Sequence, residues 1–284
     1  MSWVDFLLAL LPGLLPIAIG FVLARRGWLN PDGLLPLLRY ALVPALLLTL
    51  LLGPLAQRTV VLVGLVGVAI ALVGYWGARL LPRLVHRELS PAAARMNLLG
   101  WTLPLAALTL GGKPTLGMTL AVVFVFVATT LVLSEHGEAG FGVLIRQPWL
   151  YAALAALLVR LVQVPSGTLV AMATPLAQAS VVVLLVQLGC LFHPLPNVRD
   201  VEAWIAVALR LFVGLGLALL AVWLLPLPSA VGRAVLLAGL APAATTEQAL
   251  LVTSKEKTPR ARQVSALSTW VALLTFIAWW AVGR

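Results

Sequence analysis

Charged residues are scarce in this sequence. Asp, Glu, Lys and Arg together make up 10% of the 284 residues, only nine residues are acidic, and 62% are hydrophobic. A soluble domain carries roughly 25% charged residues, because its surface must be solvated. The composition and the mean hydropathy of +1.08 therefore exclude an ordinary soluble domain and indicate an integral membrane protein.

Cysteine and histidine are also scarce. The single cysteine, Cys190, has no partner for an internal disulfide. The histidines are His86, His136 and His193, and they lie at or beyond the ends of hydrophobic runs, without a neighbour at metal-ligand spacing. No serine or cysteine has the surrounding glycines of a nucleophile elbow. We therefore expect no enzymatic activity, and no cofactor apart from a coupling ion.

Hydrophobic runs of about 20 residues recur along the chain, and this is the length that crosses a bilayer as a helix. They predict ten spans, at residues 4–24, 34–53, 59–81, 93–111, 115–134, 147–164, 167–193, 203–225, 230–253 and 261–282. The connections are short. We expect residues 1–284 to form one all-α transmembrane domain without a soluble appendage.

The basic residues alternate in density along these spans. If the chain starts outside, 13 of the 19 Lys and Arg residues fall in cytoplasmic connections and 4 on the opposite side, while Arg160 and Arg210 lie inside spans. This bias predicts that both termini are non-cytoplasmic, in the inner (plasma) membrane of the cell. The net charge of +10 is then a topology signal, with attraction to anionic lipid as a second effect. No basic stretch is interleaved with aromatics, so we expect no nucleic-acid partner.

Spans four and nine each combine a proline with polar residues. Proline removes a backbone donor and clashes with the carbonyl one turn back, and hydrocarbon cannot satisfy the groups that it releases. A simple kink is the alternative, because Pro12, Pro16, Pro36, Pro44 and Pro175 also fall in or beside spans. The polar neighbours favour a binding site instead. The predicted site residues are Asn97, Thr102 and Pro104 in span four, and Pro242, Thr245, Thr246, Glu247 and Gln248 in span nine.

The two prolines occupy matching places in the two halves of the chain. The separation between Pro104 and Pro242 is close to half the length of the sequence. Each half holds five spans, an odd number, so the second half is expected to lie inverted relative to the first. The predicted repeats are residues 1–140 and 141–284. Inverted repeats with interrupted helices in matching positions indicate a secondary transporter.

Glu247 is the one acidic residue expected inside a span, where a carboxylate costs about 3 kcal/mol or more. Burial would let it carry a proton, whereas nearby oxygens, including that of Gln248, would make it a sodium ligand. A structural ion pair is the third alternative. Arg210 is either the counter-charge of Glu247 or of an anionic substrate, or it extends to the headgroups, as we also expect for Arg160. Hydroxyls of span ten, at Ser265, Ser268 and Thr269, either line a path or bond to helix backbone.

Several segments, in their order along the chain, resemble one transporter family. They are the opening LLPGLLPIAIGFVLARRGWLNPDGLLPLLRYALVPALLLTLLLG, then MNLLGWTLPLAAL, PLAQASVVVLLVQLGCLF and ALRLFVGLGLALLAVWLL, and finally LLAGLAPAATTEQALLVT followed by STWVALLTFIAWW. Together they are similar to the auxin efflux carrier family and its PIN-like relatives, within the bile/arsenite/riboflavin transporter superfamily.

The resemblance implies ten helices in two inverted five-helix repeats, a scaffold part and a transport part, and broken spans four and nine that cross beside the substrate. It implies secondary active transport of small organic anions, among them auxin. Asn97, Pro104 and Pro242 match the family motif, whereas Glu247 is closer to the sodium-coupled bile acid symporters. Sodium-coupled uptake is therefore one alternative, and a non-transporting membrane receptor or scaffold is another. The coupling ion is a proton, sodium or none, and a homodimer is left open.

Overall fold

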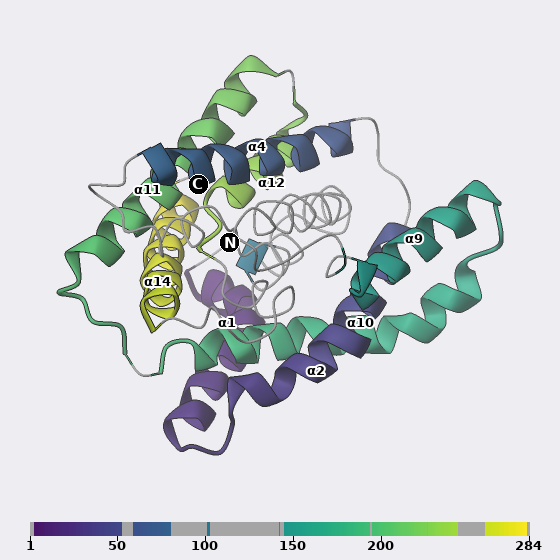
Figure 1. The fold of residues 1–284 in the computed structure, drawn as a ribbon, viewed down its shortest axis with the longest axis horizontal. Coiled ribbons are helices and arrows are strands. Elements are labelled where there is room, and N and C mark those ends of the chain that lie inside the picture. The colour runs from purple at the N-terminus through teal and green to yellow at the C-terminus, as the bar shows by residue number, and fades with distance from the viewer. Residues whose placement is uncertain are drawn as a thin grey trace.

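The computed structural model describes residues 3–52, 59–80, 101–102, 142, 145–193, 195–225, 227–243 and 259–282. All regular secondary structure in these segments is helical (Figure 1), as the hydrophobic runs predict. Of expected spans four and five, only Trp101 and Thr102 are among the described residues.

The first helices follow the predicted boundaries closely. Helix α1 spans Trp3–Arg25, and Gly27 then adopts φ 69°, the left-handed conformation that commonly ends a helix at glycine. A continuous helical rod follows, made of η1 (Pro31–Leu34), α2 (Leu35–Leu37), η2 (Leu38–Leu42) and α3 (Val43–Leu52). Its middle, η2, is a π-helical turn just before Pro44. The wider turn accommodates the proline ring without ending the rod.

The remaining helices also overlap predicted spans. They are α4 (Thr59–Leu80), α9 (Pro148–Leu161), α10 (Gly167–Cys190), α11 (Val201–Leu224), α12 (Ser229–Gly239) and α14 (Pro259–Val282). Helix α10 runs through Pro175 without interruption. Helix α12 ends at Gly239, although the hydrophobic run of span nine extends to residue 253.

Among the described residues, three helical stretches are long and apolar enough to cross a membrane: Asp32–Leu52, Gly167–Cys190 and Val201–Leu224. Large apolar side chains also cover the outside of the molecule. On α11, for example, Phe212 is 78% exposed and Trp223 is 80% exposed. Such surfaces are costly in water and ordinary against lipid. These features are consistent with a membrane protein.

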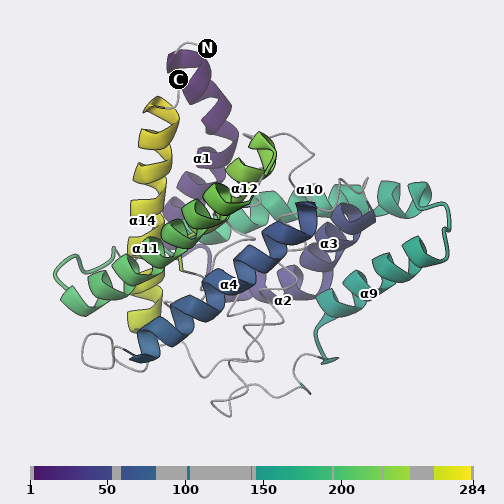
Figure 2. The ribbon, with the colours of Figure 1, turned by 90° about the horizontal axis from the view of Figure 1, so that it is seen from above.

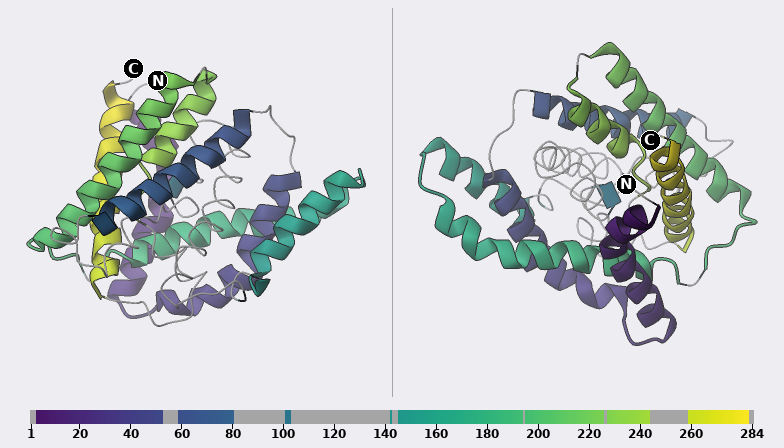
Figure 3. Two further views of the ribbon diagram at one scale, coloured as in Figure 1. Left: turned by 45° about the horizontal axis from the view of Figure 1, so that its top comes forward. Right: turned by 180° about the vertical axis from the view of Figure 1, so that it is seen from behind.

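The described helices pack in two groups. The first packing group comprises α1, the rod from η1 to α3, α9 and α10, in which α1 packs on α10 and α3 packs on both α9 and α10. The second packing group comprises α4, α11, α12 and α14, in which α11 packs on the other three. In Figure 1 the second group lies at the upper left, and Figure 3 shows it from two further sides. Buried apolar side chains from both groups join in one core.

Glycines allow the closest helix contacts. A Cβ at Gly20 of α1 would overlap the carbonyl oxygen of Val186, and one at Gly189 of α10 would overlap that of Ile17. These two contacts place backbone against backbone where α1 and α10 cross. The Cys190 thiol donates a hydrogen bond to the Gly20 carbonyl oxygen (3.3 Å). Small residues at such crossings let two membrane helices approach backbone to backbone.

Candidate functional site

The candidate site lies where α12 ends. Of the predicted site residues, the structure describes Thr102, Pro242 and Arg210, and all three are buried. The other predicted residues fall outside the described residues: Asn97, Pro104, Thr245, Thr246, Glu247 and Gln248. The proposed pairing of Glu247 with Arg210 therefore stays a prediction.

Helical hydrogen bonding stops ahead of Pro242, at the place where the sequence predicts a break. The Leu240 N–H still bonds to the Leu236 carbonyl (2.9 Å), and the Ala241 N–H bonds to the Ala238 carbonyl in a tighter turn (3.1 Å). Pro242 has no N–H to continue the series. The next donor, the N–H of Ala243, turns away from Gly239, its helical partner four residues back, and bonds to α14 instead.

Two serines of α14 bind both backbone groups of Ala243. The Ala243 N–H donates to Oγ of Ser268 (2.9 Å), and the Ser265 hydroxyl donates to the Ala243 carbonyl oxygen (2.6 Å). Ser268 in turn donates its hydroxyl proton to the Ser265 carbonyl (3.0 Å). Both serines are fully buried. Backbone groups beyond the end of a helix must find partners in an apolar interior, and at Ala243 a neighbouring helix supplies them.

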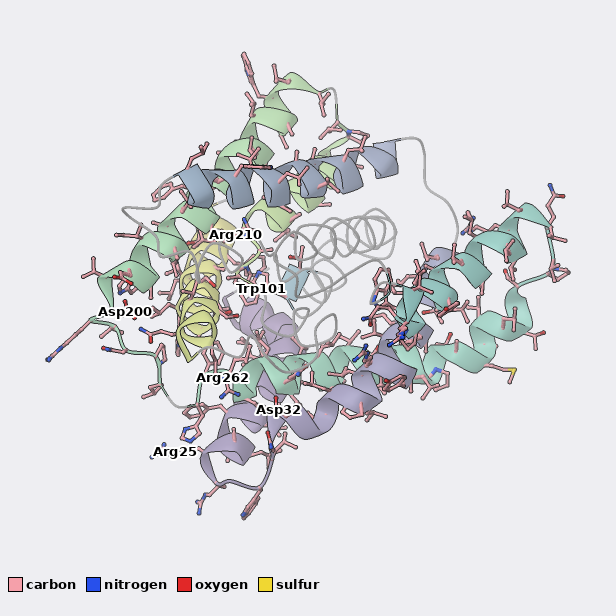
Figure 4. The ribbon with its side chains drawn as sticks, viewed as in Figure 1. Arg25, Asp32, Trp101, Asp200, Arg210 and Arg262 are labelled. Atoms are coloured by element: carbon pink, nitrogen blue, oxygen red, sulfur yellow. The ribbon has the colours of Figure 1, made fainter. Side chains whose placement is uncertain are left out.

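Arg210 of α11 lies at the same end of α12. Its side chain is 1% exposed, so the alternative that it extends to the headgroups is wrong. A Cβ built at Gly214 would overlap both Nη1 of Arg210 and the carbonyl oxygen of Gly239, which places the guanidinium beside the last carbonyl of the helix. Figure 4 shows Arg210 in the interior, away from Arg25 and Asp200 near the periphery.

The carboxyl end of α12 and the guanidinium of Arg210 carry charges of opposite sign. The carboxyl end of a helix carries the equivalent of about half a negative charge, and a guanidinium carries a full positive charge. The carbonyl end of α12 therefore stabilises the positive charge of Arg210. An anionic group at this position, from the protein or from a ligand, is favoured over a cation.

Arg160, the other arginine inside a predicted span, has a different environment. Its Nε donates a hydrogen bond to the Leu51 carbonyl near the end of α3, where the partial charge of a helix carboxyl end favours a cation. The expectation that Arg160 extends to the headgroups stays a prediction. Arg160 links α9 to α3. Both residues of this contact are well separated in sequence from the predicted site residues.

The described part of span four is also irregular. Trp101 and Thr102 have π-helical backbone two residues ahead of Pro104, and both side chains are buried. A π-turn widens the helix where a proline follows, as it does ahead of Pro44, and such turns are frequent at functional sites. In Figure 4 Trp101 lies near the middle of the view.

Sequence reasoning missed three features of this site. It did not assign Ser265 and Ser268 to Ala243, and it gave no role to Gly214. Buried serines three residues apart are a weak signal, because serine usually bonds within its own helix. Among the described residues, no group of three or more His, Cys, Asp or Glu side chains is placed to hold a metal ion.

Comparison of the chain with models of known protein families and with curated proteins finds no match. The resemblance to the auxin efflux carriers therefore stays a prediction from the chain's own segments. The proposal for function therefore rests on the end of α12 and the residues that surround it.

Proposed function

We propose that this chain is a secondary active transporter that carries a small organic anion across a membrane by alternating access. One observation carries the proposal: α12 ends in the interior at Gly239, ahead of Pro242, with a buried arginine beside its last carbonyl. Irregular backbone at membrane depth is tolerated where it meets protein or lines a cavity, and interrupted helices of this kind form the substrate sites of transporters. Arg210 favours an anionic substrate.

The way in which helices of the first half pack on helices of the second half supports inverted repeats. Helix α1 packs on α10 rather than on α3, and α9 packs on α3 rather than on α10. If spans one to five correspond to spans six to ten, the pair α1 and α10 becomes the pair α9 and α3. The pairs α3 with α10 and α4 with α11 map onto themselves. Every one of these pairs is in contact, as a two-fold relation between the halves requires.

Individual contacts support the same correspondence. The separation between Pro104 and Pro242 gives the offset between the two proposed repeats. By this offset, Gly20 in the first repeat corresponds to position 158 in the second, and Cys190 in the second corresponds to position 52 in the first. The observed contact is between Arg160 and Leu51, within two residues of both. Helix α3 ends at Leu52 and α10 ends at Cys190. These two helix ends are separated along the sequence by the same offset.

The two packing groups suggest how access would alternate. The end of α12 and its partners on α11 and α14 belong to the second group, whereas α1, α3, α9 and α10 form the first. Rocking of the second group against the first would expose the site to each side in turn. The first group would then be the scaffold, and the second would carry the substrate.

The decisive experiment is uptake by the purified protein in liposomes. Labelled benzoate and indole-3-acetate would be offered under an imposed proton gradient, an imposed sodium gradient or neither. We expect accumulation driven by one gradient, and loss of that dependence in Glu247→Gln. Arg210→Gln should abolish uptake of both anions, because the fixed positive charge is removed, whereas Arg160→Gln should retain anion uptake.

Other outcomes select the alternatives. Dependence on sodium, lost in Glu247→Gln, would identify sodium-coupled uptake. Saturable binding without net flux would identify a receptor. Full uptake by Arg210→Gln would contradict the proposed role of the arginine.

A further inference from the structure

Two buried serines of α14 hold the backbone at the end of α12. We infer that Ser265 and Ser268 are positioning residues for the transport site, an inference that rests on the proposed function. They would hold Ala243 in the non-helical conformation that keeps the site open, and would thereby make α14 and the end of α12 a single unit. No substrate contact is required of either hydroxyl.

The hydrogen-bond partner of Ser265 lies outside its own helix, unlike the partner of an ordinary helix serine. Several other buried or half-buried hydroxyls donate to a carbonyl of their own helix, as Ser180 does to Ala177 (2.6 Å) and Thr275 to Val271 (2.8 Å). Such bonds duplicate the helix and add little to its fold. Ser265 donates instead to Ala243, 22 residues away. Its bond therefore fixes one segment of chain relative to another.

The pair of bonds is complementary. Ser268 accepts from the N–H of Ala243, and Ser265 donates to the carbonyl of the same residue. A single bond would leave Ala243 free to rotate about it, whereas two bonds on one residue fix the orientation of both adjoining peptide groups. Ser268 uses its own proton for the Ser265 carbonyl, so its oxygen is oriented to accept.

The burial of Ala243 makes these bonds energetically important. Ala243 is 1% exposed and both serines are fully buried, so water does not replace a lost partner. A buried backbone group without a partner destabilises the conformation that exposes it. If a hydroxyl is removed, the chain around Ala243 should shift to recover a partner, and the residues that follow Pro242 should move with it.

The test compares three serine variants in liposomes. Ser268→Ala removes the acceptor for the Ala243 N–H. Ser268→Cys retains a weak acceptor of similar shape. Ser180→Ala is the matched control, because Ser180 is equally buried but bonds only within α10. The readouts are the concentration of indole-3-acetate that half-saturates uptake, the maximal rate, and amide hydrogen exchange of peptides containing Ala243.

We expect Ser268→Ala to raise the half-saturating concentration about tenfold, the usual effect of one buried hydrogen bond on an equilibrium, and to speed exchange at Ala243. Ser268→Cys should fall between it and the native protein, and Ser180→Ala should match the native protein. A merely structural role would lower the maximal rate by reducing the amount of folded protein, without moving the half-saturating concentration.

The inference and the proposed function fail separately. If the native protein accumulates neither anion, the proposed function is overturned, and hydrogen exchange alone then decides whether the serines hold Ala243. If Ser268→Ala leaves exchange at Ala243 unchanged, or if Ser180→Ala moves the half-saturating concentration equally, the positioning role is overturned.

Discussion

Gly214 and Arg210 lie one turn apart on α11, and the first residue makes room for the second. A Cβ at Gly214 would overlap Nη1 of Arg210 and the carbonyl oxygen of Gly239. Gly239 is equally confined, because its own Cβ would meet Ala218 Cβ at 2.5 Å and the Gly214 carbonyl oxygen at 2.7 Å. The guanidinium reaches the end of α12 because both helices present glycine there.

A pair of glycine variants on α11 tests this confinement. Gly214→Ala should lower stability by about 1 to 3 kcal/mol, because the added methyl group forces Arg210 or the α12 backbone to shift. Gly216→Ala is the matched control, since a Cβ there meets nothing within 4 Å and alanine is the better helix former. Thermal unfolding in detergent measures both. Equal melting temperatures for the two variants would contradict the close approach.

At the scale of elements, α1 and α10 form the closest helix pair of the first packing group. Gly20 faces Val186 and Gly189 faces Ile17, each with backbone against backbone. Hydrophobic collapse does not drive helix association in lipid, because the tails are as apolar as leucine, so such close packing is the main source of stability. The pairing also joins the two halves of the chain.

Substitution of one glycine at this crossing should weaken the pair. We expect Gly189→Ala to destabilise the protein by about 1 to 3 kcal/mol, through overlap with the Ile17 carbonyl. Gly167→Ala serves as the control on the same helix, because a Cβ at that position meets nothing within 4 Å. Unfolding by titration with sodium dodecyl sulfate gives both values. A neutral Gly189→Ala would show that α1 and α10 separate readily.

At the scale of the whole molecule, the start of α1 and the end of α14 lie together at one end of the structure (Figure 2). The ten predicted spans, an even number, would place both termini on the same side of a membrane, and this arrangement agrees with that prediction. The charge distribution of the sequence predicts that this end is non-cytoplasmic, since most of the basic residues fall in the connections on the other side.

Two exposed valines test the predicted orientation. Val162 follows α9 and is 70% exposed, and Val198 precedes α11 and is 65% exposed. We expect Val162→Cys to react with a membrane-impermeant maleimide applied to intact cells, and Val198→Cys to react only after the membrane is opened. The native chain is the control, because Cys190 is buried. The reverse pattern would invert the predicted topology, and labelling of both positions in intact cells would contradict the membrane crossing between them.

Hydrophobic runs predicted the described helices well, because helix formation in an apolar phase depends on length and local composition. The end of α12 was predicted for a similar local reason, the missing donor of Pro242. The partners of that end were not predictable in the same way. Ser265 and Ser268 lie on a later helix, well separated from Ala243 along the chain, and nothing near them in sequence indicates the contact.

The sequence by itself determined that the described segments are helical and of membrane-spanning composition, with prolines inside several of these helices. Which proline ends a helix was decided by the tertiary structure. Helix α10 continues through Pro175, whereas α12 ends before Pro242. Both prolines lack a backbone N–H, so the proline alone does not decide whether the helix ends. A helix can end in the interior only where the backbone groups beyond its end find other partners nearby. At Pro242 two buried hydroxyls of α14 bind Ala243, the next residue along the chain, and Arg210 lies beside the last carbonyl of the helix.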